Sequence, residues 1–562
     1  MFPSRLVKRA ALVLGAALVT VMVLGLTACG GGDEEEEGTP SGSTPAATAA
    51  TPGGGATTEA GQPKYGGTIQ MIGQYMGNTD PHIQPNQIAT SQFWMVVSNQ
   101  LFHATAGFGI EPDLAESWEQ PSDTTLVLHI AKNVKWQNVP PTNGRAFTAA
   151  DVKYNLDRIS TPGPSYPYNE TFKTITDVKV VDDYTVQLTL SQPYAYLLNA
   201  LAIPALCMVS HEEVEAAGST GIALEAVGTG PYIMTQYTPD IAANFKRNPD
   251  YWKKDKDGNQ LPYLDGFDYL YIADPTAADA AFRSGQIQIG SITPTSAIPD
   301  YLKGHPEVAD LVYTAANPYM MVMNNKVKPF DDVRVRQAVA YATNRADYGT
   351  VIYTNDWAPL YGPVPDIFEG WSVGEAGGIP YDPVKAKQLL TDAGYPDGFK
   401  VDALEATFST NPYVQAAQVG QSQLKSALNI DINIVTDTLA SWAAKAYRGE
   451  IACFWFVDQQ FSLPSQYVDR RFHTGASGNW TFYSNAEVDK LIDDHYVQTD
   501  IKKAQQMLVD AQKIIVNEAP HTYLMVPVGH FMHYNYLHGF DPSVGSTGGQ
   551  WFYQLETAWS SK

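Results

Sequence analysis

Residues 114–158, LAESWEQPSDTTLVLHIAKNVKWQNVPPTNGRAFTAADVKYNLDR, carry the signals of a strand, a tight turn and a capped helix in succession. Apolar residues alternate with other residues over positions 126–130, which is the period of a half-buried strand. Asn143-Gly144 supplies the turn. Thr148 followed three residues later by Asp151 forms a capping box, and apolar residues then recur at helical spacing. The segment predicts local α/β structure and shows no catalytic constellation.

The particular residues of this segment resemble the signature of one family. Ala115-Glu-Ser-Trp118, Val134-Lys-Trp136 and Asp157-Arg-Ile159 are similar to motifs of the family 5 extracytoplasmic solute-binding proteins, the peptide- and nickel-binding receptors of bacterial ABC importers. The resemblance continues through FKRNPDYW (245–252) and PFDDVRVRQAVAYATNR (329–345). It therefore extends over most of the chain that follows residue 62.

Strand and helix signals alternate along the chain, which predicts an α/β fold with buried sheets. The resemblance implies a two-lobed periplasmic-binding-protein clamshell of type II, in the large peptide-binder form with an extra inserted subdomain. The expected parts are lobe one at 62–103, 211–316 and 525–562, the inserted subdomain of lobe one at 104–210, and lobe two at 317–524.

Composition restricts the class of partner. The chain has 562 residues, 44% of them hydrophobic, so it can bury more than one core. Its formal net charge of -23 disfavours nucleic acid and anionic lipid surfaces. After the N-terminal segment no stretch approaches about 18 apolar residues, so we do not expect the chain to be a permease.

Residues 1–29 read as a lipoprotein signal peptide. A basic start with Arg5, Lys8 and Arg9 precedes an apolar run of signal-peptide length. The run ends in Leu-Thr-Ala-Cys29, which resembles a lipobox and implies lipid attachment at Cys29; the alternative is an ordinary signal peptide with an incidental cysteine. Residues 30–63 are acidic and then rich in Ser, Thr, Pro, Ala and Gly, which predicts a flexible tether.

The candidate ligand site lies at the end of an apolar run, residues 451–457, which Asp458 terminates. An acid at the mouth of a buried strand needs a partner, because an unpaired charge there is costly. The resemblance implies that Asp458 pairs with the ammonium group of a peptide ligand and that Trp455, Phe456 and Trp442 line the pocket. The alternative is that Asp458 pairs with an internal arginine or caps a loop.

Two departures from the family pattern weaken the peptide assignment. The usual Tyr-x-(Asp/Glu)-Pro after the acid is replaced here by residues 459–464, QQFSLP. An arginine that some peptide binders carry upstream is Ala452 in this chain. The sequence also places no basic group for a ligand carboxylate.

Other chemistry-bearing residues favour structural roles. His530, His533 and His538 lack an accompanying framework of metal-ligand spacing, so we expect no metal site and no cofactor. His211-Glu-Glu lacks the second histidine of a zinc protease motif. Cys207 and Cys453 lie in apolar runs, which favours buried free thiols, although a disulfide between them stays open. No catalytic residue is predicted, and the chain is not expected to be an enzyme.

The predicted function is that of an extracytoplasmic receptor, anchored to the membrane by lipid, which captures a solute by hinge closure and delivers it to ABC permease subunits. A separate ATPase would supply the energy, since no Walker motif is present. A peptide is the favoured ligand and a monomer the expected state. An oligosaccharide or metal complex as ligand, a sensory surface protein, and an extracytoplasmic hydrolase are the alternatives.

Overall fold

The computed structural model describes residues 62–73, 80–83, 93–105, 109–162, 168–218, 222, 226–407, 412–458, 461, 463–541 and 550–562. The chain separates into Met1–Thr51 and Pro52–Lys562, and every described residue belongs to the second unit. Cys29, the expected signal peptide and all but the last residues of the expected tether lie outside the described residues.

A twelve-stranded sheet is the framework of the described residues, in the order β16-β15-β17-β13-β18-β11-β1-β10-β9-β8, with β12 and β14 also pairing with β18. The strands are β1 Thr68–Ile72, β8 Tyr232–Thr238, β9 Ala242–Arg247, β10 Gly266–Leu270, β11 Ile289–Gly290, β12 Val308–Thr314, β13 Tyr319–Met323, β14 Trp357–Pro359, β15 Lys400–Thr407, β16 Asp431–Thr438, β17 Cys453–Val457 and β18 His521–Tyr534.

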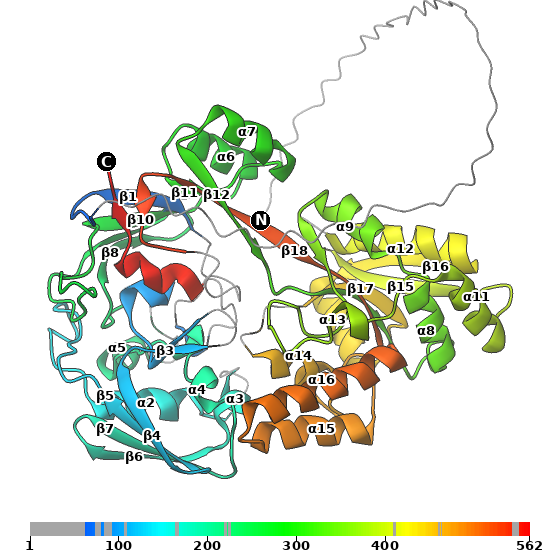
Figure 1. Ribbon diagram of the computed structural model, residues 1–562, viewed down its shortest axis with the longest axis horizontal. Helices are drawn as coiled ribbons and strands as arrows, with labels where there is room; N and C mark the ends of the chain where they lie inside the picture. The colour runs from blue at the N-terminus through cyan, green and yellow to red at the C-terminus, as the bar shows by residue number, and fades with distance from the viewer. Residues whose placement is uncertain are drawn as a thin grey trace, which may run out of the picture. The chain divides into compact units, whose positions relative to one another are not determined.

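Strand β18 joins the two halves of this sheet (Figure 1). Its first residues pair with β13, Pro527 pairs with β14, and residues 528–534 pair with β12. The chain also crosses between the halves at residues 315–318, which connect β12 to β13. These two crossings each contain a proline, Pro318 and Pro527, and together they are called the hinge below.

Helices cover both faces of the β13–β16 half, which is lobe two. Most begin at a side-chain cap: Asn344, Asp382 and Asp500 each accept hydrogen bonds from the first backbone N–H groups of the helix that follows. The helices of this half are α8 Val333–Tyr341, α9 Arg345–Tyr353, α10 Gly374–Gly377, α11 Pro383–Asp392, α12 Pro412–Leu428, α13 Leu439–Arg448, α14 Pro464–Phe472, α15 Ala486–Val497 and α16 Ile501–Glu518.

Residues 114–158 form the structure that the sequence predicts. The alternating residues lie on β5, Thr125–Ile130, where Leu126, Leu128 and Ile130 are buried, and Asn143 and Gly144 both adopt positive φ in the turn. The capping box of Thr148 and Asp151 opens α2, Ala149–Ile159. A separate four-stranded sheet, β4-β5-β7-β6, holds this segment; β4 is Ala115–Ser122, β6 Ile175–Asp182 and β7 Thr185–Leu190.

Several short elements precede and follow the strands of the four-stranded sheet along the chain. They comprise β2 Phe102–Ala104, β3 Ile110–Pro112, α3 Asn169–Phe172, α4 Leu197–Ala200, η2 Pro204–Leu206 and α5 His211–Ala217. Just before α4, Tyr196 packs edge-to-face on Trp371 of lobe two at 5.1 Å between ring centroids, and the Ala195 N–H donates to the Tyr496 carbonyl at 3.0 Å. The region that contains the smaller sheet therefore contacts lobe two directly.

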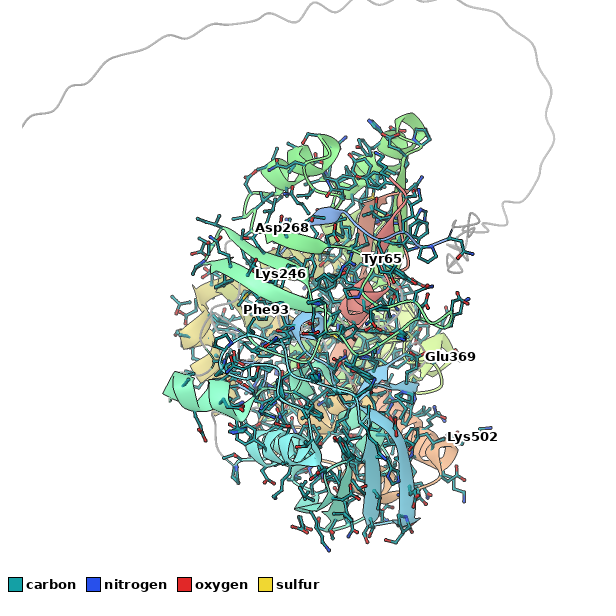
Figure 2. The ribbon with its side chains drawn as sticks, turned by 90° about the vertical axis from the view of Figure 1, so that its left-hand side faces the viewer. Tyr65, Phe93, Lys246, Asp268, Glu369 and Lys502 are labelled. Carbon is teal, nitrogen blue, oxygen red and sulfur yellow. The ribbon has the colours of Figure 1, made fainter. Side chains whose placement is uncertain are left out.

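The β8–β11 half is the framework of lobe one. Figure 2 shows Lys246 on β9 and Asp268 on β10 near one another, with Phe93 below them. Phe93 is fully buried and meets Phe245 edge-to-face at 5.9 Å. The remaining elements of this lobe are α6 Pro275–Arg283, η4 Thr295–Ala297, α7 Ile298–Gly304, β19 Leu537–His538, η5 Gln550–Glu556 and β20 Trp559–Ser560.

The expectation for the two cysteines is met. Cys207 and Cys453 are buried free thiols, and burial raises the pKa of each above its ordinary value. Over the described ranges, no helix combines the length and the apolar character that crossing a membrane requires.

Candidate functional site

The candidate site lies at the C-terminal end of β17. Side chains alternate along this strand, so Phe454, Phe456 and Asp458 point to one side of the sheet and Trp455 points to the other. The backbone N–H of Asp458 donates to the Pro318 carbonyl at 2.9 Å, and that carbonyl belongs to the 315–318 crossing. The site is therefore adjacent to the hinge between the lobes.

Asp458 is 2% exposed and forms a salt bridge with Arg471 of α14. The Arg471 Nε lies 2.6 Å from Oδ2, and Nη2 donates to Oδ1. Nη1 donates to the Gly478 carbonyl at 2.9 Å, which holds the guanidinium in place. Pairing with an internal arginine, the alternative left open from the sequence, is thus present in this structure. Two N–H groups aligned with two carboxylate oxygens form the strong bidentate arrangement.

An aromatic cluster of Trp442, Phe454, Phe456 and Trp480 surrounds this ion pair. Trp442 stacks on Phe456 with ring centroids 5.8 Å apart, and Phe456 meets Trp480 edge-to-face at 4.9 Å. The Arg471 guanidinium carbon lies 4.2 Å from the Trp480 ring centroid and 5.5 Å from that of Phe456. The negative faces of aromatic rings attract such a cation. The cluster therefore stabilises the same arginine that neutralises Asp458.

Trp455 lies on the opposite face of the sheet. It is 1% exposed, its indole N–H donates to the Tyr348 hydroxyl at 3.3 Å, and it packs so closely on α12 that a Cβ added to Gly420 would lie 2.1 Å from its ring. The structure thus brings Asp458, Phe456 and Trp442 together and places Trp455 in the core behind them.

Glu405 of β15 is a buried acid that sequence reasoning missed. Its Oε1 accepts the Trp455 backbone N–H at 2.9 Å, where β15 and β17 separate beyond their pairing at Ala403 and Cys453. Burial raises the pKa of Glu405 to about 8, opposed by the hydrogen bond from Trp455. The raised pKa favours the neutral form of this carboxyl at pH 7. Glu405 lies two residues after the buried Ala403, so the period of a strand places both side chains on the same face of β15. This spacing is the sequence signal that could have identified Glu405 as buried.

The three C-terminal histidines are each in separate surroundings. His530 lies between Asp310 and Asp356, with Nδ1 and Nε2 at 2.7 and 3.1 Å from their respective oxygens. His533 Nδ1 is 3.1 Å from the Tyr534 carbonyl, and His538 Nε2 is 3.2 Å from the Ser561 hydroxyl. Among the residues that the structure describes, no three His, Cys, Asp or Glu side chains are grouped to hold a metal ion.

Comparison with known proteins places this geometry in a class. The periplasmic binding protein DppA from Helicobacter pylori, solved in complex with the peptide STSA, superposes with a TM-score of 0.73 at 23% identity, covering 89% of this chain and 99% of that chain. The fold is therefore that of the two-lobed periplasmic binding proteins.

The sequence is more specific about family. The family of bacterial extracellular solute-binding proteins, family 5 (middle), matches residues 109–479, and the chain belongs to this family. The glutathione-binding protein GsiB of Salmonella choleraesuis is 30% identical over 468 residues, covering 77% of this chain and 85% of the relative. The haem-binding protein A of Haemophilus influenzae is 28% identical over 451 residues, covering 75% and 79%.

Proposed function

We propose that this protein is the extracytoplasmic receptor of an ABC importer and that its ligand is a short peptide. It captures the ligand in the cleft between the lobes, and contacts that exist only in the closed form shift the population toward closure. The closed form is then recognised by permease subunits driven by a separate ATPase. The protein acts as a monomeric receptor, without a cofactor and without turning its ligand over.

The observation that carries this proposal is the position of Asp458 and the aromatic cluster beside the hinge. The negative charge of a carboxylate attracts a peptide ammonium. The rings of Phe456 and Trp480 suit apolar peptide side chains. DppA was solved in complex with a peptide, and GsiB is a binding protein for glutathione, itself a tripeptide.

The test is a thermal-shift screen of residues 62–562 against di- to tetrapeptides, glutathione, oligosaccharides and chelated metals. A peptide at 100 times its dissociation constant should add roughly 2.7 kcal/mol of stability. Asp458→Asn should weaken binding of a free-amine peptide far more than binding of its N-acetyl form. Glu450→Gln, which changes an exposed acid paired with Arg448, is the matched control.

Each other outcome points to a specific alternative. An oligosaccharide hit that Asp458→Asn leaves unchanged would retain the receptor and remove the peptide. Equal loss of free and acetylated peptides in Asp458→Asn would assign Asp458 a structural role only. Peptide hydrolysis during incubation would revive the enzymatic alternative.

We also propose that the protein is anchored by lipid at Cys29. The supporting features are the basic start, the apolar run and the Leu-Thr-Ala-Cys29 sequence. Several acyl chains give a stable anchor, whereas one chain binds only marginally. Cells fed an alkyne fatty acid should label the wild-type protein, and Cys29→Ala should remove the label and release the protein from membranes. Retained label in Cys29→Ala would reject the site.

A further inference from the structure

All but one of the arginine side chains in the described part of the chain donate hydrogen bonds to the protein itself. Of the ten arginines there, nine donate hydrogen bonds to carboxylates or backbone carbonyls. These are Arg145, Arg158, Arg247, Arg283, Arg334, Arg336, Arg345, Arg448 and Arg471. Within the described ranges, Arg470 alone makes neither a hydrogen bond nor an ion pair.

Solvent exposure does not explain this exception. Arg334 and Arg448 have side chains 47% and 56% exposed, and both form bidentate contacts with a nearby acid. Arg470 is also exposed, yet in a chain with 59 acidic residues none of the described ones forms an ion pair with it. Its five N–H donors are therefore available to a group from outside the chain.

Arg470 lies at the rim of the candidate site. It precedes Arg471 on α14, so the two side chains leave the helix about 100° apart, one outward and one into the Asp458 salt bridge. Its Cγ runs past Gly478, where an added Cβ would lie 2.7 Å away, and its guanidinium carbon ends 5.7 Å from the Phe461 ring centroid.

The local charge balance favours an anion at this rim. Asp458 and Arg471 neutralise one another, which leaves the Arg470 charge uncompensated. Desolvation by the surrounding protein and then repulsion by Arg471 lower the pKa of Arg470, while Asp458 and Tyr447 oppose this change. An arginine nevertheless stays charged at any physiological pH. A ligand carboxylate would supply the opposite charge that offsets the desolvation and the repulsion by Arg471.

We propose that Arg470 binds a carboxylate of the ligand, so that the site selects peptides by a free carboxyl group as well as by their ammonium. This inference rests on the proposed peptide-binding function. The guanidinium fork matches a carboxylate with two parallel N–H donors, which a lysine cannot reproduce. Arg470 is thereby the basic group that the sequence alone does not place.

The experiment compares free-acid and C-terminally amidated forms of one panel, dipeptides and tripeptides of Ala, Leu and Phe together with glutathione, by titration calorimetry on residues 62–562. Amidation should weaken binding to the wild type roughly tenfold to a hundredfold, the value of a charge-assisted hydrogen bond. Arg470→Gln should weaken binding of the free acids by a similar factor and leave the amides nearly unchanged. Arg470→Lys should recover part of the loss.

Arg448→Gln is the matched control, because it removes an exposed arginine that already has an acid partner. It should bind free acids and amides as the wild type does. If free acids and amides bind alike, or if Arg470→Gln weakens both forms equally, the assignment of Arg470 is wrong while the peptide receptor stands. If no peptide in the panel binds in either form, both the assignment and the proposed function are wrong.

Discussion

Two buried carboxylates, Asp113 in lobe one and Asp458 in lobe two, are each paired with a basic side chain, but their surroundings differ. The Lys253 Nζ lies 2.8 Å from Oδ1 of Asp113, His103 Nε2 lies 3.1 Å from Oδ2, and the Gln100 backbone N–H donates to Oδ2 at 2.9 Å. Lys253 also contacts Glu556 at 3.3 Å. The charges around Asp113 are thus satisfied by groups of the chain itself.

The Asp458 site is different because it includes an arginine, Arg470, that has no hydrogen-bond or ion-pair partner among the described residues. Asp458 and Arg471 balance, and Arg470 follows beside them without a hydrogen bond. Around Asp113, burial alone would raise the carboxyl pKa, yet His103 and Lys253 hold it well below its usual range. The Asp113 network, in which each charge has a partner within the chain, stabilises the packing of the segments that contribute to it. Arg470, whose N–H donors have no partner among the described residues, is available to a ligand.

The largest expected effect is the loss of stability on breaking the closed network. Lys253→Met keeps the length of the side chain and leaves Asp113 and Glu556 without their shared cation. Removing one partner of a buried ion pair costs about 3–5 kcal/mol, because a charge stays buried without compensation. Urea unfolding should show this loss. Lys256→Met, which changes an exposed lysine paired with Asp257, should show none.

A smaller loss is expected at the candidate site, from Arg471→Gln. Asp458 would lose its bidentate partner, but the nearby Arg470 charge partly compensates, so we expect about 3 kcal/mol. Arg470→Gln should change the free energy of unfolding by less than about 0.5 kcal/mol, as surface substitutions do. Equal losses from these two adjacent arginines would show that Arg470 is structural and would remove the contrast between the two regions.

Local signals account for what the sequence predicts correctly. The strand at 126–130, the Asn143-Gly144 turn and the Thr148 capping box each depend on residues within four positions, and the structure confirms all three. The α/β class, predicted from the alternation of strand and helix signals, is also confirmed, and so is the two-lobed form, which came from the family resemblance.

The candidate site depends on contacts that no local signal reports. Arg471 lies 13 residues after Asp458, on a separate helix, so nothing in the strand sequence identifies it as the partner. Helices cover both faces of β17, and a strand buried on both sides reads as a continuous apolar run. The side of the sheet to which Trp455 and Phe456 point could not be distinguished from that run.

The smallest expected effect comes from a third charged group, which lies on the strand β18 that joins the two halves of the large sheet. His530 lies on β18 between Asp310 of β12 and Asp356, which precedes β14. The hydrogen bond to Asp310 raises the pKa of His530 above 6.5, opposed by burial and supported by Asp356. The stability from this contact is complete below pH 6.5 and is lost as pH rises through the raised pKa.

Urea unfolding from pH 5.5 to 8.5 tests this contribution by comparing wild type with His530→Gln. The wild type should exceed the variant most at low pH, and the difference should shrink as pH rises. His533→Gln is a control of opposite sign, because burial lowers the pKa of His533 and its protonation opposes folding as pH falls. A pH-independent difference for His530→Gln would mean that strand pairing of β18, and not the charge of His530, stabilises this region. The contrast in charge pairing would then apply only to the surroundings of Asp113 and Asp458.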